Sequence, residues 1–147
     1  MEEERTLTHE EILSLTPQRD PIQLVDEAVS LIPGKEVTAV YRVPEDLSVL
    51  KGHFPGDPTF PGVYSVEALL QTGNLMILTL DRYKGKTPLV LGLDHVSFRQ
   101  KIRPGDVLIL HAEIVRERKE KAIVFCKGTV SVEGAVATEA EFVMAPR

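Results

Sequence analysis

The chain has 147 residues, of which 43% are hydrophobic and 27% are charged, and its formal net charge at pH 7 is −5. This length suits one domain, and the composition is that of an ordinary globular protein rather than a disordered chain, a collagen or a coiled coil. The acidic balance argues against a nucleic-acid-binding surface, which needs an excess of clustered lysine and arginine. We expect a single domain over residues 1–147 with no nucleic-acid partner.

The amino terminus and the cysteine content indicate the cell compartment. Residues 2–4 are glutamates, and no apolar run of the signal-peptide type follows them, so we expect a cytoplasmic protein. Cys126 has no second cysteine with which to form an internal disulfide. It lies in a predicted strand, where we expect a buried and unreactive thiol.

A short helix is expected near the amino terminus, over Glu10–Leu15. Thr8 and Glu11 are spaced as the two members of a capping box, which satisfies free backbone N–H groups at a helix start. Two apolar stretches follow on either side of a proline-glycine turn. We expect them to form a pair of strands: Ile22–Leu31 and Glu36–Val43.

The longest apolar segment runs from Val63 to Leu80, with apolar residues at helical spacing. Its length approaches that of a membrane span, but Glu67, Gln71 and Asn74 interrupt it, and a charge inside lipid costs several kcal/mol. Because the segment is apolar on nearly every side, other elements must wrap it. It therefore predicts a long helix that is buried in protein and does not enter a membrane.

Four later stretches rich in Val, Ile, Leu and Phe are expected to be strands: Leu89–Phe98, Asp106–Glu117, Ala122–Val132 and Val136–Met144. Short links join the last three, and Glu133-Gly134 is typical of a two-residue hairpin connection. Neighbouring strands should therefore pair antiparallel. The expected fold is α+β, with a strongly bent antiparallel sheet wrapped around one central helix.

The segment from Gly52 to Gln71 carries most of the chemical information. Three prolines and three glycines among its first eleven residues predict a rigid, irregular loop that leads directly into the long helix. Gly62 offers a backbone amide at the positive end of that helix, where it can donate to a carbonyl oxygen that gains negative charge. A tight structural turn is the alternative, because proline and glycine mark turns more often than oxyanion sites.

Two titratable side chains accompany this amide. His53 lies in the rigid loop, while Glu67 belongs to a polar stripe of the helix with Gln71 and Asn74. Burial disfavours the charged form of a carboxyl group, so Glu67 is a candidate general acid; a structural carboxylate bonded to Gln71 is the alternative. Base, acid and oxyanion donor together suit elimination alpha to a thioester carbonyl.

The same segment matches, at every fixed position, the pattern His-Phe-Pro-Gly-x-Pro-x-x-Pro-Gly-Val-x-x-x-Glu-Ala-x-x-Gln. It resembles the active-site signature of the β-hydroxyacyl-[acyl-carrier-protein] dehydratases of bacterial type II fatty acid synthesis. Weaker similarity in Pro17–Asp26, Phe98-Arg99 and residues 104–106 extends the resemblance over most of the chain. In the first of these blocks, Gln18 and Asp20 depart from the family's usual histidine and aromatic residue.

The resemblance implies the hot dog fold, a homodimer with two sites at its interface, commonly a trimer of dimers, and no metal or organic cofactor. His53 of one subunit would face Glu67 of its neighbour across an acyl tunnel. His53 would take the C2 proton of a (3R)-hydroxyacyl chain on acyl carrier protein, while the Gly62 amide polarises the carbonyl. Glu67 would protonate the leaving hydroxyl to give the trans-2-enoyl product.

A bifunctional branch of the same family, which also isomerises the product, departs from this chain at two positions. It typically carries aspartate at the position of Glu67 and a cysteine soon after the Pro-Gly pair, where this chain has Val63. Isomerisation is therefore the less favoured activity.

Other side chains are assigned on the same basis. We expect an acyl tunnel lined by Phe54, Val63, Tyr64 and Phe98, with packing in the core as the alternative for the aromatic residues. Two basic clusters, Arg82/Lys84/Lys86 and Arg99/Lys101/Arg103, are candidates to dock an acidic carrier protein, the second above all, or are simply solvated turn charges. His9, His95 and His111 have no ligand spacing along the chain, so we expect no metal site.

Two other functions stay open at this point. One is thioester hydrolysis on the same fold, and the other is a non-catalytic module that binds or senses acyl thioesters. The presence of both His53 and Glu67 counts against the second.

Overall fold

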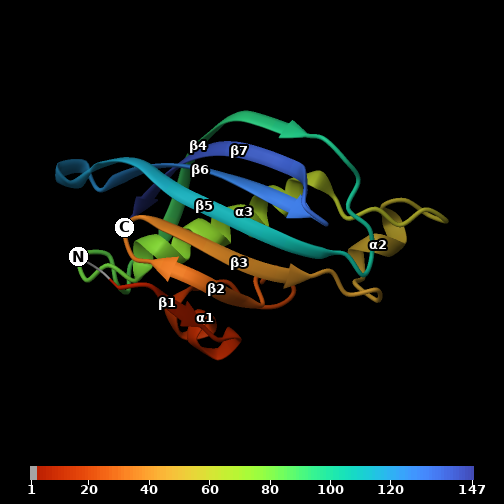
Figure 1. Cartoon of the computed structure of the whole chain (residues 1–147), viewed down its shortest axis with the longest axis horizontal. Helices are drawn as coiled ribbons and strands as arrows, with labels where there is room; N and C mark the ends of the chain where they lie inside the picture. Colours follow the sequence, from red (N-terminus) through yellow and green to blue (C-terminus); the bar gives the residue numbers. More distant parts are fainter. Residues whose placement is uncertain (1–2) are drawn as a thin grey trace.

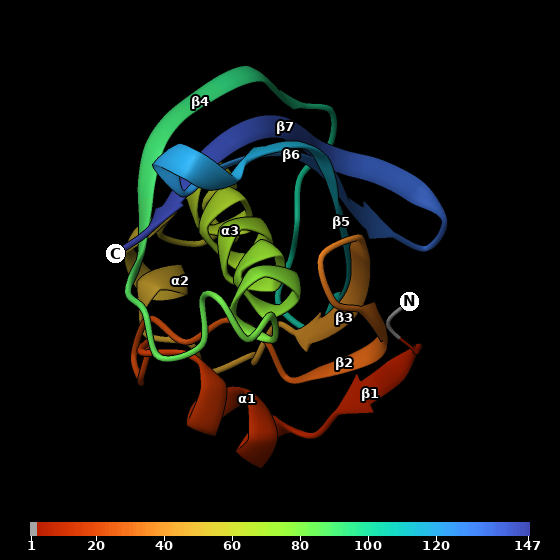
Figure 2. The same cartoon turned by 90° about the vertical axis from the view of Figure 1, so that its left-hand side faces the viewer.

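A computed structural model describes residues 3–147 of the chain. An antiparallel sheet curls around one long helix, α3 (Gly62–Leu78), as Figures 1 and 2 show. The strands are β1 (Arg5–Leu7), β2 (Glu27–Ile32), β3 (Glu36–Arg42), β4 (Pro88–Phe98), β5 (Val107–Arg118), β6 (Ile123–Val132) and β7 (Ala135–Pro146). Two short helices, α1 (His9–Leu15) and α2 (Val49–Gly52), and a 3₁₀ turn (Lys119–Lys121) complete it. The strand order is β1-β2-β3-β5-β6-β7-β4, and the arrangement confirms the predicted hot dog fold.

The long helix is buried along almost its whole length. Between Ser65 and Leu78, Glu67 is the one residue that is not buried. Gly73 allows the ring of Phe142 on β7 to approach the helix closely, since a Cβ atom at Gly73 would lie 2.8 Å from that ring. In residues 3–147, no helix is long and apolar enough to cross a bilayer.

Two local predictions are confirmed in detail. At the start of α1, the Thr8 hydroxyl accepts a hydrogen bond from the Glu11 N–H at 3.2 Å, and the Glu11 carboxylate accepts one from the Thr8 N–H at 2.9 Å. Between β6 and β7, Glu133 and Gly134 have φ angles of 50° and 80°. Two successive positive φ angles are the mark of the tight hairpin turn that matches strand twist.

Some boundaries and elements differ from those predicted. Helix α3 ends at Leu78 rather than at Leu80, because the chain turns there and the Leu80 N–H donates to the carbonyl of Ile77. Strand β1 and helix α2 were not expected from the sequence. Both are too short to show a period, and β1 exists because it pairs with the edge of β2.

The single cysteine is unreactive by position. Cys126 lies on β6 and is 3% exposed. Burial raises the pKa of its thiol to about 12, so the thiol is uncharged at neutral pH.

Strand β4 forms one edge of the sheet beside β7. Its apolar side chains are unusually exposed for a strand in a folded chain: Leu89, Val90, Leu91, Leu93, Val96 and Phe98. A long apolar edge strand is a template for pairing with another chain. This edge is therefore the part of the sheet best suited to contact a second subunit.

Candidate active site

His53 stands where helix α2 ends and the loop rich in proline and glycine begins. Its Nδ1 lies 3.0 Å from the carbonyl oxygen of Thr59, and the Thr59 N–H donates to the His53 carbonyl at 2.6 Å. Because a carbonyl oxygen only accepts hydrogen bonds, Nδ1 must carry a proton. The neutral ring then keeps its lone pair on Nε2, which is the atom able to act as a base.

The loop that carries His53 is anchored to the segment between β4 and β5. The Phe60 N–H donates to the Ile102 carbonyl at 2.8 Å. The Asp57 carboxylate accepts hydrogen bonds from Lys101 at 2.9 Å and from Arg103 at 3.3 Å. Hydrogen bonding and charge from Lys101, followed by the hydrogen bond from Arg103, hold the pKa of Asp57 below its usual value. The rigidity predicted from the loop composition therefore has external support.

Gly62 is the first residue of α3, so its N–H has no acceptor within the helix. The amide is thus available to a substrate oxygen at the positive end of the helix. A Cβ atom at Gly62 would lie 2.8 Å from the ring of Phe98 on β4. Glycine is therefore required here for the close approach of Phe98 as well as for access to the amide.

One pocket of about 520 Å³ gathers many of the predicted site residues. Its lining is His53, Thr59, Phe60, Pro61, Gly62, Val63, Phe98, Arg99, Gln100, Lys101, Ile102 and Thr138. Two of the four tunnel candidates lie outside this pocket. Phe54 is exposed and stacks on the His53 ring, with 4.1 Å between ring centroids, while Tyr64 packs edge-on against the buried Phe60 ring at 5.8 Å. Their role as tunnel residues stays a prediction.

A buried hydroxyl pair behind Gly62 was not predicted. Ser65 Oγ donates to the Gly62 carbonyl at 2.6 Å and lies 2.7 Å from Thr138 Oγ1 on β7. Since the Ser65 proton is used on Gly62, Thr138 must donate in the second bond. The pair ties the first turn of α3 to the sheet. The sequence signal was slight, a lone serine in an apolar helix.

Glu67 is half-buried one turn further along α3, and Gln71 holds it. Gln71 Nε2 donates to Glu67 Oε2 at 2.7 Å and to the Ile22 carbonyl at 2.7 Å, while Gln71 Oε1 accepts from the Leu24 N–H at 2.9 Å. The predicted polar stripe is therefore a bridge between the helix and the segment before β2. Its third member, Asn74, has a buried side-chain oxygen that finds no partner within residues 3–147.

The two predicted catalytic side chains do not meet within one chain. Glu67 is absent from the pocket that His53 lines, and no hydrogen bond or ion pair within residues 3–147 joins them. One chain thus holds the predicted base and the predicted oxyanion donor in one place and the predicted acid in another. The predicted meeting of the two across a subunit interface stays a prediction.

The basic clusters differ in how their charges are used. Arg82 makes two hydrogen bonds to the Glu117 carboxylate, at 2.9 and 2.6 Å, so its charge is largely neutralised. In the other cluster, Arg99 forms an ion pair with Glu139, and Asp57 forms ion pairs with both Lys101 and Arg103. The side chains of three exposed cations share two carboxylates there, and a third carboxylate, Asp106, accepts from the Arg103 backbone N–H at 2.8 Å.

We expect Gln71→Met to lower the free energy of unfolding by about 1–3 kcal/mol, because it leaves the buried Leu24 N–H and the partly buried Ile22 carbonyl without their partner. Urea unfolding followed by circular dichroism measures this. Thr72→Val is the matched control, since the Thr72 hydroxyl bonds only within α3, to Ala68. Equal stability of the two variants would contradict the bridging role of Gln71.

The chain is similar to known proteins in sequence and in fold. A family model described as a FabA-like domain matches residues 16–141. The chain is 42% identical over 135 residues to a 3-hydroxyacyl-[acyl-carrier-protein] dehydratase FabZ of Enterococcus faecalis, covering 92% of this chain and 94% of the relative. A protein of the same name from Clostridium acetobutylicum is 40% identical over 136 residues, covering 92% and 95%. Among solved structures, the dehydratase heterocomplex ApeI:P from Xenorhabdus doucetiae shares the fold, with a TM-score of 0.77, 16% identity and coverage of 92% and 90%.

Proposed function

This chain belongs to the FabA-like family of 3-hydroxyacyl-[acyl-carrier-protein] dehydratases, and we propose that it uses His53 and Glu67 to remove water from the 3-hydroxyacyl chain during fatty acid synthesis. The enzyme is a hydro-lyase. The observation that supports this role for His53 is its geometry. Thr59 fixes the ring so that Nε2 is the basic atom, and the ring lines the same pocket as the Gly62 amide. The cytoplasmic location and the acyl carrier protein as substrate carrier belong to the same proposal.

The first half of the elimination takes place at C2. His53 Nε2 removes the C2 proton of the thioester, and the electrons move toward the carbonyl oxygen. The Gly62 N–H stabilises the negative charge on that oxygen, where the helix dipole adds to the effect. The bond between Thr59 and Nδ1 stabilises the protonated ring that results, because Nδ1 donates to a carbonyl oxygen in both states.

The second half takes place at C3. Glu67, as the neutral acid, gives its proton to the leaving hydroxyl, so the C3–O bond breaks, water departs and the C2–C3 double bond of the trans-2-enoyl product forms. Gln71 donates to Oε2 of Glu67, which leaves Oε1 free to face the substrate. This geometry supports Glu67 as a held proton donor.

A second copy of the chain brings the acid to the base in this proposal. The exposed apolar edge of β4 is the surface for pairing, and Phe98 at its end lines the His53 pocket. A two-fold dimer joins identical surfaces, so both pockets are completed at once. We propose a homodimer, in hexamers a trimer of dimers, in which His53 of one subunit serves with Glu67 of the other.

Mixing two inactive variants tests this arrangement. His53→Ala and Glu67→Gln are each expected to lack dehydration when pure. After joint unfolding and refolding, mixed dimers contain one intact site, and activity should return to about a quarter of the wild-type value. Formation of the enoyl absorbance, measured against free-thiol release, also separates dehydration from thioester hydrolysis. Two variants that stay inactive when mixed, in demonstrated mixed dimers, would contradict the shared site.

For carrier docking, we expect Lys101→Ala with Arg103→Ala to lower kcat/KM for a carrier-linked substrate about tenfold at low salt, through loss of electrostatic steering. The exposure of both cations and the position of Lys101 in the lining of the His53 pocket support this expectation. The change in kcat/KM for a short thioester without the carrier measures how much of the loss has a cause other than docking. The control is Lys84→Ala with Lys86→Ala in the other basic cluster. An equal loss in both double variants would contradict docking at Lys101 and Arg103.

A further inference from the structure

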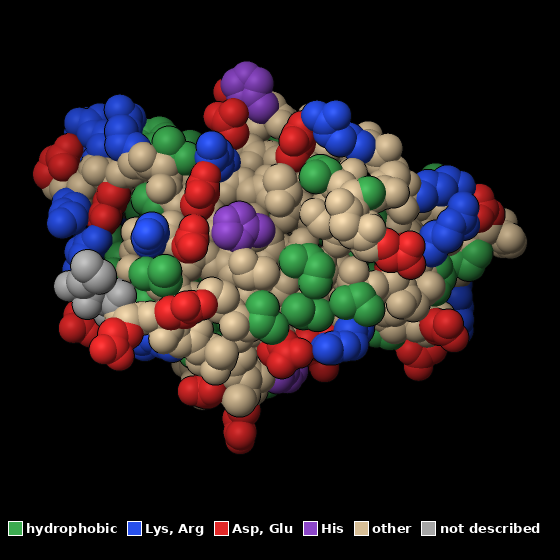
Figure 3. Space-filling model, viewed as in Figure 1, with side chains coloured by type: hydrophobic (Ala, Val, Ile, Leu, Met, Phe, Trp, Pro, Cys, Tyr) green, Lys and Arg blue, Asp and Glu red, His purple; other side chains and the backbone are tan. Residues whose placement is uncertain are grey.

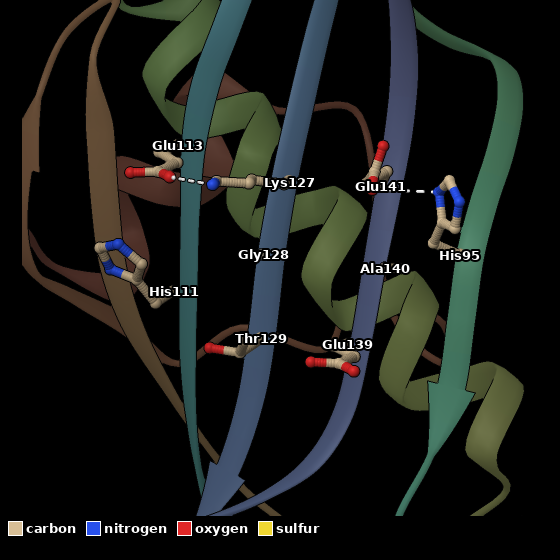
Figure 4. Close-up of a pocket in the computed structure, with 9 residues that line it drawn as sticks. All are labelled: His95, His111, Glu113, Lys127, Gly128, Thr129, Glu139, Ala140 and Glu141. Atoms are coloured by element: carbon tan, nitrogen blue, oxygen red, sulfur yellow. Dashed lines mark ion pairs between the residues drawn. The ribbon is translucent and has the colours of Figure 1, made fainter.

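The outer face of the sheet, opposite α3, carries a hollow lined by charged and histidine side chains (Figures 3 and 4). At one side of it, Glu36, His111 and Glu113 each offer a donor atom, and these three atoms lie within 4.8 Å of one another. All three residues are half-buried. We propose that these residues bind a divalent transition-metal ion of the Zn²⁺ type, with water in the remaining coordination positions. One imidazole nitrogen and two carboxylates form a donor set that such ions accept.

Strand pairing creates the cluster. Glu36 on β3 is directly opposite Glu113 on β5, and Thr38 is directly opposite His111. Two like charges at opposed positions destabilise a sheet unless a cation lies between them. Among residues 3–147, the Glu36 carboxylate makes no hydrogen bond or ion pair. A bound cation would neutralise both carboxylates and join β3 to β5.

The imidazole is already oriented for this role. Thr38 Oγ1 lies 2.9 Å from His111 Nδ1. When Nδ1 donates to that hydroxyl, Nε2 keeps the lone pair that a metal needs. A hydrogen bond of this kind at the second ring nitrogen is the usual companion of a metal-bound histidine.

Lys127 on β6 is the natural competitor of the metal. Its Nζ lies 3.3 Å from Glu113 Oε1, and Figure 4 shows it between the strand that carries Glu113 and the strand that carries Glu141. The ammonium neutralises Glu113 when no ion is bound and must be displaced, or share the carboxylate, when one is. Removal of this lysine charge should therefore strengthen metal binding, which a merely structural cluster would not predict.

The proposed site is independent of the dehydratase site. Val37 and Ala112, the chain neighbours of Glu36, His111 and Glu113, are buried under the sheet against the core. The ligands therefore point away from α3 and from the His53 pocket. From the sequence alone we expected no metal, because the histidines are not spaced as metal ligands along the chain. The pairing of β3 with β5 is what brings the three proposed ligands together.

Isothermal titration of the untagged, chelator-treated whole protein with ZnCl₂ tests the site. We expect one Zn²⁺ per chain, lost in His111→Ala and in Glu36→Gln. Thr38→Val should weaken Zn²⁺ binding about tenfold, because the His111 ring loses the hydrogen bond that orients it. Lys127→Met should strengthen Zn²⁺ binding. His95→Asn is the matched control, since His95 lies in the same hollow, 3.1 Å from Glu141 and 3.6 Å from Asp94, and should leave the affinity unchanged.

Three results would overturn the proposal. The first is an absence of Zn²⁺ binding by the wild-type protein. The second is loss of binding in His95→Asn with binding kept in His111→Ala, which would put the ion at the other histidine. The third is weaker binding after Lys127→Met. Circular dichroism confirms that each variant is folded before it is titrated.

Discussion

His53→Ala is expected to lower kcat for dehydration of a carrier-linked 3-hydroxyacyl substrate at least about a hundredfold, the usual contribution of a general base. The variant removes the one ring whose Nδ1 is fixed by the Thr59 carbonyl and whose Nε2 is free, while Gly62 remains to bind the carbonyl. KM should therefore change much less than kcat. Formation of the enoyl product, followed by its absorbance, measures both constants.

His9→Ala is the control for this experiment, because His9 is exposed on α1, lies outside the β4 edge and the His53 pocket, and should leave turnover unchanged. Near-normal turnover by His53→Ala would remove His53 from the mechanism. A parallel loss in both variants would instead indicate a general effect on folding or assembly.

Gly128→Ala is expected to destabilise the protein by about 3 kcal/mol or more, at the upper end of the cost of overpacking. Gly128 lies on β6 opposite Ala112, and a Cβ atom there would come 2.4 Å from the His111 carbonyl oxygen and 2.8 Å from the Leu69 side chain. The first neighbour is backbone of the adjoining strand and cannot rotate away. The ladder between β5 and β6 must therefore open locally.

Urea unfolding of Gly128→Ala beside Gly52→Ala tests this expectation. A Cβ atom at Gly52 meets no atom within 4 Å, so that variant controls for the loss of glycine flexibility alone. Equal stability of the two variants would contradict the expected clash. It would mean that β5 and β6 can move apart at Gly128 without loss of stability.

Much of the fold was predictable because its signals are local. The apolar period of α3, the Thr8 capping box and the Glu133-Gly134 turn all depend on residues within a few positions of one another. Strand β1 was missed because three residues show no period, and only the neighbouring β2 defines it. Short elements held by a partner have no independent signature in the sequence.

The candidate site was likewise predictable only where its residues are close together in the sequence. His53, Gly62 and Glu67 could be named as candidates because one continuous segment carries all three, and their roles stay predictions. The hydroxyl pair of Ser65 and Thr138 was missed, since β7 meets the helix start only after folding. The hydrogen bond that fixes the His53 ring could not be predicted from the sequence either, because its acceptor is the backbone carbonyl of Thr59 and not a side chain.

The strand order also dictates when each part of the enzyme can form. Strand β4 pairs in the sheet with β7 alone, and β7 is the last strand of the chain, so β4 cannot join the sheet until β7 has folded. Until then the exposed apolar edge of β4 and one side of α3 stay uncovered. Strands that are far apart in the sequence pair slowly. Subunits that pair through β4 should therefore associate only after β7 has folded.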